Sequence, residues 1–126
     1  MEPKSVLVVD DDPSILAVVR DILESEGYNV STATNGMDGL EAMRVAPYAL
    51  VILDMRMPVV DGWSFASFLD AFDNPVPILV MTAGQDAREW AKEVGATHYL
   101  EKPFDLPDLL NAVTDIIGPV RTEEGL

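Results

Sequence analysis

The segment VLVVDDDPSI, residues 6–15, joins a short apolar run to three aspartates and a proline. A continuous run of valine and leucine is typical of a strand buried on both faces of a parallel sheet. Asp12 followed by Pro13 is typical of a helix start, with the aspartate as N-cap and the proline in the first helical position. The segment therefore predicts a strand that leads through Asp10 and Asp11 into a helix.

The same order of strand and helix recurs along the chain. Apolar runs alternate with segments whose apolar residues are spaced by three and four, as on one face of a helix. This alternation predicts an α/β fold with an open parallel sheet and helices on both faces. The predicted strands are Val6–Val9, Asn29–Ala33, Ala49–Leu53, Ile78–Met81 and His98–Leu100. The helix stripes predicted to face the core are Ile15, Val19, Ile22 and Leu23; Met37, Leu40 and Met43; Phe65, Phe68, Leu69 and Phe72; Ala87, Trp90, Ala91 and Val94; and Leu106, Leu109, Leu110, Val113, Ile116 and Ile117. Gly27, Gly95 and Gly118 stand where helices should end, and Asp105 where the last should begin.

Length and composition bound the class of protein. At 126 residues and 48% apolar content, one compact domain is expected. A net charge of −14, from 8 basic and 22 acidic residues, argues against direct nucleic-acid binding. The absence of cysteine excludes disulfides and thiolate chemistry. With no apolar run long enough to span a membrane and no signal segment in MEPKS, a cytoplasmic location is expected.

The residues just past the predicted strands lie at the edge where such sheets bind ligands, beyond the carboxyl ends of the strands. The residues concerned are Asp10, Asp11, Asp54, Thr82, Ala83 and Lys102. Three carboxylates at one edge repel one another unless a cation or a proton intervenes. An all-oxygen cluster favours Mg²⁺, with Mn²⁺ as an alternative.

Each of these residues also has a plainer interpretation. Acidic residues after the first strand favour a helix N-terminus, although they cannot all cap one helix. Lys102 would pair with Glu101 on the surface, and Thr82 would be an ordinary end to a strand. Asp54 is harder to explain in this way, because it follows a buried-type strand and a carboxylate can attack a phosphoryl group to form an acyl phosphate.

Four motifs together resemble the receiver domain of two-component response regulators, of the kind found in chemotaxis regulators: VLVVDDDPSI, LVILDMRMPVVDGW, PILVMTA and HYLEKPFD. The resemblance runs from about residue 4 to residue 117. It implies a flavodoxin-like, doubly wound (βα)5 sandwich whose five-stranded parallel sheet has the order 2-1-3-4-5. The receiver domain would occupy residues 1–118, and residues 119–126 would be a C-terminal tail or a truncated linker.

The resemblance also assigns roles to individual residues. It makes Asp54 the phosphoacceptor, with Mg²⁺ bound by Asp54, Asp10, Asp11 and the backbone carbonyl of Arg56. It makes Lys102 the phosphate-binding lysine, Thr82 the switch hydroxyl and Tyr99 the switch aromatic, and it implies a cis Lys102–Pro103 bond.

Some positions depart from the family pattern or vary within it. Val59 occupies a turn position where the family often has glycine or asparagine. Arg56 would project near the phosphate, where it would alter hydrolysis or pair with the acidic cluster, or it would simply be exposed to solvent. His98 is interpreted as a strand-end residue, and Trp63 and Trp90 as packing or partly exposed residues.

The implied function is a phosphorylation-controlled switch and not an enzyme with turnover. The phosphoryl donor would be a sensor histidine kinase or a histidine phosphotransfer protein. The output would pass through the face formed by the fourth helix, the fifth strand and the fifth helix, which would also serve for a homodimer. An Asp-based phosphohydrolase is disfavoured, because the acidic residue usual two positions after Asp54 is absent. A pseudo-receiver that only binds partners is disfavoured by the intact set of site residues.

Overall fold

The computed structural model describes residues 4–57, 60–69, 76–84 and 86–120. Within these ranges it contains one parallel five-stranded sheet, as the sequence pattern predicts, with the order β2-β1-β3-β4-β5 that the family resemblance implies. The strands are β1 Ser5–Val9, β2 Asn29–Ala33, β3 Leu50–Leu53, β4 Ile78–Ala83 and β5 His98–Lys102. The helices are α1 Pro13–Ser25, α2 Gly36–Val45, α3 Gly62–Leu69, α4 Ala87–Glu93 and α5 Leu106–Ile117.

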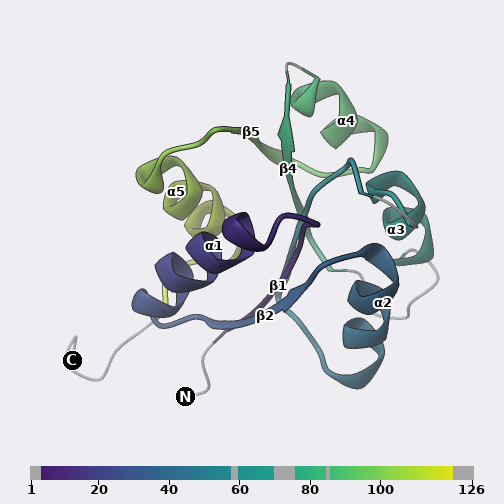
Figure 1. Ribbon diagram of the computed structural model, residues 1–126. Helices are drawn as coiled ribbons and strands as arrows, with labels where there is room; N and C mark the ends of the chain where they lie inside the picture. The colour runs from purple at the N-terminus through teal and green to yellow at the C-terminus, as the bar shows by residue number, and fades with distance from the viewer. Residues whose placement is uncertain (1–3, 58–59, 70–75, 85, 121–126) are drawn as a thin grey trace.

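Helices cover both faces of the sheet (Figure 1), with α1 and α5 on one face and α2, α3 and α4 on the other. Alternate residues of β1 enter different cores. Val6 and Val8 pack in the cluster under α1 and α5, whereas Leu7 and Val9 pack in the cluster under the other three helices. All four are fully buried, which explains why this strand is apolar without interruption.

Helix ends follow the predicted signals. The Asp12 carboxylate accepts a hydrogen bond from the Ser14 backbone N–H at 2.9 Å at the start of α1. Asp105 caps α5 in the same way through the Asp108 backbone N–H at 3.1 Å. Gly27, which follows α1, has a φ of 95°, a conformation that residues with a Cβ rarely adopt.

Three residues predicted to face the core are exposed instead. Met37, Phe68 and Leu106 expose 55%, 51% and 48% of their surface. In α2 the inward face carries Gly36 and Gly39, so this helix approaches its neighbours through glycine and the Met37 side chain is turned outward.

The same kind of offset occurs in α3 and α5. The buried face of α3 is made of Gly62, Phe65, Ala66 and Leu69, which leaves Phe68 outside it. Leu106 is the first residue of α5, ahead of the stripe that packs. Phe72 lies outside the described residues. None of the described helices combines the length and the apolar character that a membrane span requires.

Candidate functional site

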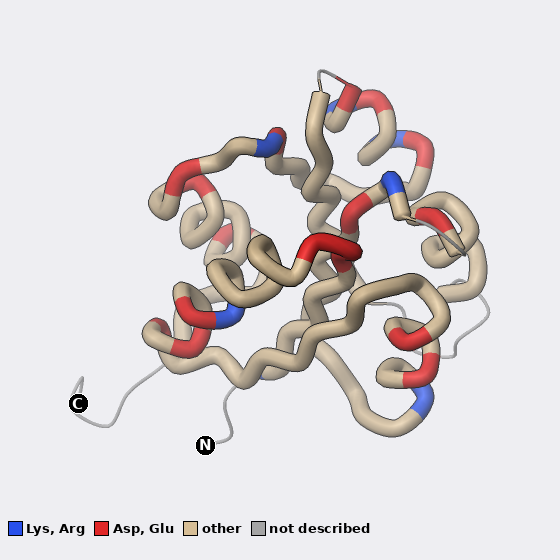
Figure 2. Tube along the Cα trace, viewed as in Figure 1, with Lys and Arg blue, Asp and Glu red and all other residues tan. Residues whose placement is uncertain are grey.

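Four chain segments meet at the carboxyl edge of the sheet. Asp10 directly follows β1 and Asp54 directly follows β3. Thr82 and Lys102 come from β4 and β5, which are longer than predicted, so both residues lie within the last pairs of the sheet and not beyond it. In Figure 2 the acidic stretch after β1 lies at this edge, near the centre of the view.

The three carboxylates of the predicted site are close together. Asp10, Asp11 and Asp54 each offer an oxygen atom within 4.8 Å of the others. Asp10 and Asp54 are buried, with 0% and 4% of their surface exposed, whereas Asp11 is exposed. Two buried carboxylates at this separation are costly unless positive charge compensates them.

Lys102 supplies part of that compensation. Its Nζ lies 2.6 Å from Asp10 Oδ2 and 3.6 Å from Asp54 Oδ2. Within the described residues, Lys102 therefore pairs across the sheet edge with these two groups, and not with its neighbour Glu101. The Lys102 ammonium group thus already lies close to Asp54, the carboxylate predicted from the sequence to be the phosphoacceptor.

The pKa of the Asp54 carboxyl is raised from 3.8 to about 6. Burial is the main cause, and the negative charges of Asp10 and, to a smaller extent, Asp11 add to it. The positive charge of Lys102 and the Arg56 backbone N–H, which donates to Asp54 Oδ1 at 3.3 Å, act in the opposite direction. One lysine thus leaves the cluster with an excess of negative charge, which a divalent cation would neutralise.

The backbone fixes the two buried aspartates. The Asp10 N–H donates to the Ala33 carbonyl at 3.1 Å, and the Asp54 N–H donates to the Val9 carbonyl at 2.9 Å. Asp10 Oδ1 also accepts the Asp12 N–H at 2.9 Å, while the Asp12 side chain caps α1. Capping therefore explains Asp12 alone, and the other two aspartates after β1 need another account.

Thr82 adds a polar group at the same edge. The residue is almost fully buried, and among the described residues its Oγ1 has no hydrogen-bond partner. A buried hydroxyl without a partner is uncommon and is a cost that a ligand with acceptor oxygens would relieve.

Comparison with known protein families identifies the family of this chain. The family described as response regulator receiver domain matches residues 6–114. The chain belongs to this family. Receiver domains are signalling switches of two-component systems, and the described cluster contains the family's acidic site.

Relatives and solved structures agree with this membership. The receiver domain is 44% identical over 89% of its length to the transcriptional regulatory protein PrrA of Mycobacterium leprae, of which it spans 49%. It is 33% identical to the chemotaxis response regulator CheY4 of Vibrio cholerae, with a TM-score of 0.83, over 90% of this chain and 98% of that one. It is also 33% identical to the response regulator TrrA of Thermotoga maritima in complex with Mg²⁺-BeF, with a TM-score of 0.81, over 90% and 98% of the two chains. The chain spans about half the length of PrrA and of the Escherichia coli regulator PcoR.

The sequence also leads to expectations about the Lys102–Pro103 bond, Tyr99 and His98. The Lys102–Pro103 peptide bond is cis. Tyr99 lies on β5 with 41% of its surface exposed, so its ring is not buried in this conformation. His98 is the first residue of β5, consistent with its interpretation as a strand-end residue. Val59 lies outside the described residues.

An aromatic cluster beside the site was not foreseen. The guanidinium carbon of Arg56 lies 4.9 Å from the centroid of the Trp90 ring, and Trp90 meets Trp63 edge-on at 5.0 Å between centroids. Arg56 is exposed, which agrees with the interpretation of this residue as a solvent-exposed arginine. Its guanidinium nevertheless contacts the Trp90 ring. From the sequence, the two tryptophans are interpreted separately, as packing or partly exposed residues. They meet because α3 and α4 are neighbours on one face of the sheet.

Proposed function

We propose that Asp54 accepts a phosphoryl group and that its phosphorylation switches this receiver domain between two arrangements. The observation that supports this most strongly is the convergence of the Asp10, Asp11 and Asp54 oxygens within 4.8 Å, with the Lys102 ammonium directed at two of the three. A divalent cation beside Lys102 would offset the negative charge of these carboxylates and of a phosphoryl group bound among them.

The donor set fits Mg²⁺, with Mn²⁺ as the alternative hard ion. Asp10, Asp11, Asp54 and the backbone carbonyl of Arg56 would hold it. When bound, the ion neutralises the carboxylates and the phosphoryl oxygens and so lowers the cost of bringing them together. The presence of Mg²⁺-BeF in the TrrA complex supports this choice.

The transfer step is a displacement at phosphorus. An Asp54 carboxylate oxygen attacks the phosphorus of a phosphohistidine on a sensor histidine kinase or a histidine phosphotransfer protein. The O–P bond forms as the P–N bond breaks, the electron pair returns to the imidazole, and the imidazole regains a proton from water. Asp54 must be ionised to attack, so its raised pKa makes the charge of the metal and of Lys102 important near neutral pH.

Lys102 and Thr82 would hold the product. Lys102 would contact one phosphoryl oxygen as a point charge, and the buried Thr82 hydroxyl would find there the acceptor that it lacks. Movement of Thr82 toward the phosphoryl group would open space for the Tyr99 ring to turn inward from its exposed position. A local change of charge acting on a two-state element is the general logic of such switches.

The output would pass through the face formed by α4, β5 and α5, to a downstream protein or to a second copy of this chain. The strongly acidic surface disfavours direct contact with nucleic acid. PrrA is a transcriptional regulatory protein of which this chain matches about half, so control of an attached or separate output module is one form that this function would take. The reaction is limited to the domain's own phosphorylation and dephosphorylation in the cytoplasm.

Intact mass measured after incubation with Mg²⁺ and acetyl phosphate tests the proposal. The wild type and the exposed-site control Asp21→Asn should each gain one phosphoryl group, whereas Asp54→Asn should gain none and Lys102→Met much less. A gain that persists in Asp54→Asn would refute the assignment. Sustained hydrolysis of phosphate esters over many turnovers would favour the phosphohydrolase instead.

A further inference from the structure

Arg56 connects the acidic site to a helix. Its backbone N–H donates to Asp54 Oδ1 at 3.3 Å, while its guanidinium lies 4.9 Å from the centroid of the Trp90 ring on α4. The residue thus contacts the carboxylate proposed to be phosphorylated with one end and an aromatic side chain with the other. No other arginine or lysine among the described residues has both contacts.

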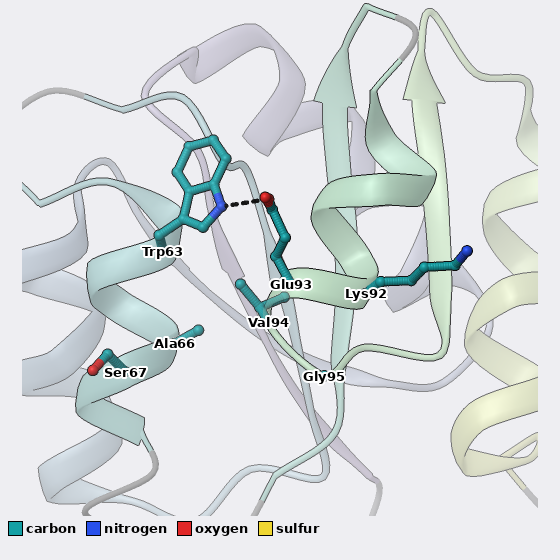
Figure 3. A pocket seen from close by; sticks show the side chains of 7 residues that line it. All are labelled: Trp63, Ala66, Ser67, Lys92, Glu93, Val94 and Gly95. Carbon is teal, nitrogen blue, oxygen red and sulfur yellow. Dashed lines mark hydrogen bonds between the residues drawn. The ribbon is translucent and has the colours of Figure 1, made fainter.

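The contact with Trp90 continues toward α3. Trp90 packs against Trp63 at an interplanar angle of 70°, and the Trp63 Nε1–H donates to Glu93 Oε2 at 3.0 Å. Trp63 and Glu93 both line a pocket of about 430 Å³ between α3 and α4. Figure 3 shows the Trp63 indole turned toward the Glu93 carboxylate, while the Lys92 side chain points away from Trp63. The wall of this pocket is therefore joined to Arg56 through two rings that meet edge-on.

We propose that Arg56 exchanges the Trp90 ring for the phosphoryl oxygens when Asp54 is phosphorylated, and that this exchange changes the Trp63–Glu93 wall of the pocket between α3 and α4. The inference rests on the proposed function, because it needs a phosphoryl group on Asp54. It adds a route from the site to the pocket between α3 and α4, in addition to the face formed by α4, β5 and α5.

Relative strengths of interaction favour the exchange. A phosphoryl group brings up to about two negative charges and three strong acceptor oxygens, and a guanidinium binds such oxygens in a bidentate way. An exposed contact between a cation and an aromatic ring is weaker. Lys102 is shared between Asp10 and Asp54, and Arg56, two residues from Asp54 in the sequence, is a further cation that could contact a phosphoryl oxygen.

Loss of the cation would be transmitted through the rings. Without the guanidinium over its face, Trp90 would lose one of the contacts that fix its orientation. Trp63, which packs against this ring, would then be held less firmly. The hydrogen bond from Trp63 to Glu93 would then change in length or break. By thermodynamic reciprocity, a ligand that fixed this pocket wall would change the ease of phosphorylation.

The test follows the two indole N–H resonances by NMR, assigned with Trp63→Phe and Trp90→Phe, while phosphoryl occupancy is measured by intact mass in Mg²⁺ and acetyl phosphate. In the wild type and in the control Arg44→Met, both indole resonances should shift in proportion to occupancy. In Arg56→Met, compared at equal occupancy, the Trp63 shift should be lost. In Thr82→Ala it should remain.

The outcomes separate the two proposals. An adduct in the wild type without a Trp63 shift would overturn the exchange alone, as would an unchanged Trp63 shift in Arg56→Met. Loss of the shift in Thr82→Ala at equal occupancy would assign the response to the threonine and overturn the separate route. No adduct at all would overturn the proposed function and the exchange with it.

Discussion

Replacing Asp54 with asparagine is expected to stabilise the folded protein in metal-free buffer above neutral pH. Asp54 is buried with only 4% of its surface exposed, and its carboxyl shares the sheet edge with the buried Asp10. Burial and this like charge raise the pKa of Asp54 from 3.8 to about 6. The ionised carboxylate therefore has a higher free energy in the folded protein than in the unfolded chain. A neutral amide of the same shape removes this free-energy cost.

The size of the effect follows from the pKa difference. Each unit of difference between the folded and unfolded states corresponds to about 1.4 kcal/mol, so a rise from 3.8 to about 6 corresponds to a cost of about 3 kcal/mol once the group is ionised in both states. The raised pKa already includes the attraction to Lys102, so about 1–3 kcal/mol of added stability is expected.

The sign of the pH dependence is also fixed. Between the unfolded and folded pKa values the folded state binds more protons, so the wild type loses stability as the pH rises from about 4 to about 6. Asp54→Asn lacks this titration. The difference in free energy of unfolding between the two proteins should therefore be small at about pH 4 and reach its full value of about 1–3 kcal/mol above pH 7.

Urea denaturation followed by circular dichroism, in EDTA, measures this gap at the two pH values. Asp21→Asn removes one charge from an exposed position on α1 and controls for the general relief of a net charge of −14. Surface changes of this kind are usually within about 0.5 kcal/mol. An Asp54→Asn protein no more stable than the control above pH 7, or one with the same gap at acidic pH, would refute the reasoning.

Other substitutions test the fold that holds the site. Leu109→Ala, in the fully buried part of α5, should lower the free energy of unfolding by about 2–5 kcal/mol in the same assay, and a loss below about 1 kcal/mol would contradict its place in the core. Asn35→Ala should cost about 1 kcal/mol, because the Asn35 side chain accepts the Asp38 backbone N–H at 2.8 Å at the start of α2; no loss would contradict that cap. Gly62→Ala would place a Cβ 2.6 Å from the Met55 Cα, so a loss of about 1–3 kcal/mol and slower phosphorylation by acetyl phosphate are expected, and wild-type values for both would show that the contact is easily relieved.

The parallel sheet and the acidic edge were predictable because they depend on local signals, whereas the strand order followed only from the family resemblance. An uninterrupted apolar run such as Val6–Val9 is needed only where helices cover both faces of a sheet. Once the strands are parallel and alternate with helices, the residues that follow them must meet at one edge. That is why Asp10, Asp54 and Lys102 were expected together before any distance was known.

Side-chain exposure and contacts between helices were less predictable. A spacing of three and four places Met37 on an apolar stripe. In the structure α2 instead packs through Gly36 and Gly39, whose lack of a side chain lets the helix backbone lie close to its neighbours, and Met37 is left exposed. The contact between Trp63 and Trp90 depends on how α3 and α4 lean toward each other, which no local pattern in either helix encodes.

Chemical trapping of the phosphorylated residue tests the central claim most directly. Sodium borohydride reduces an aspartyl phosphate to homoserine, which peptide mass spectrometry locates in the sequence. After reaction with acetyl phosphate in Mg²⁺, the account predicts homoserine at position 54 and none when EDTA replaces the metal. Homoserine at Asp10 or Asp11, or an equal yield in EDTA, would contradict it.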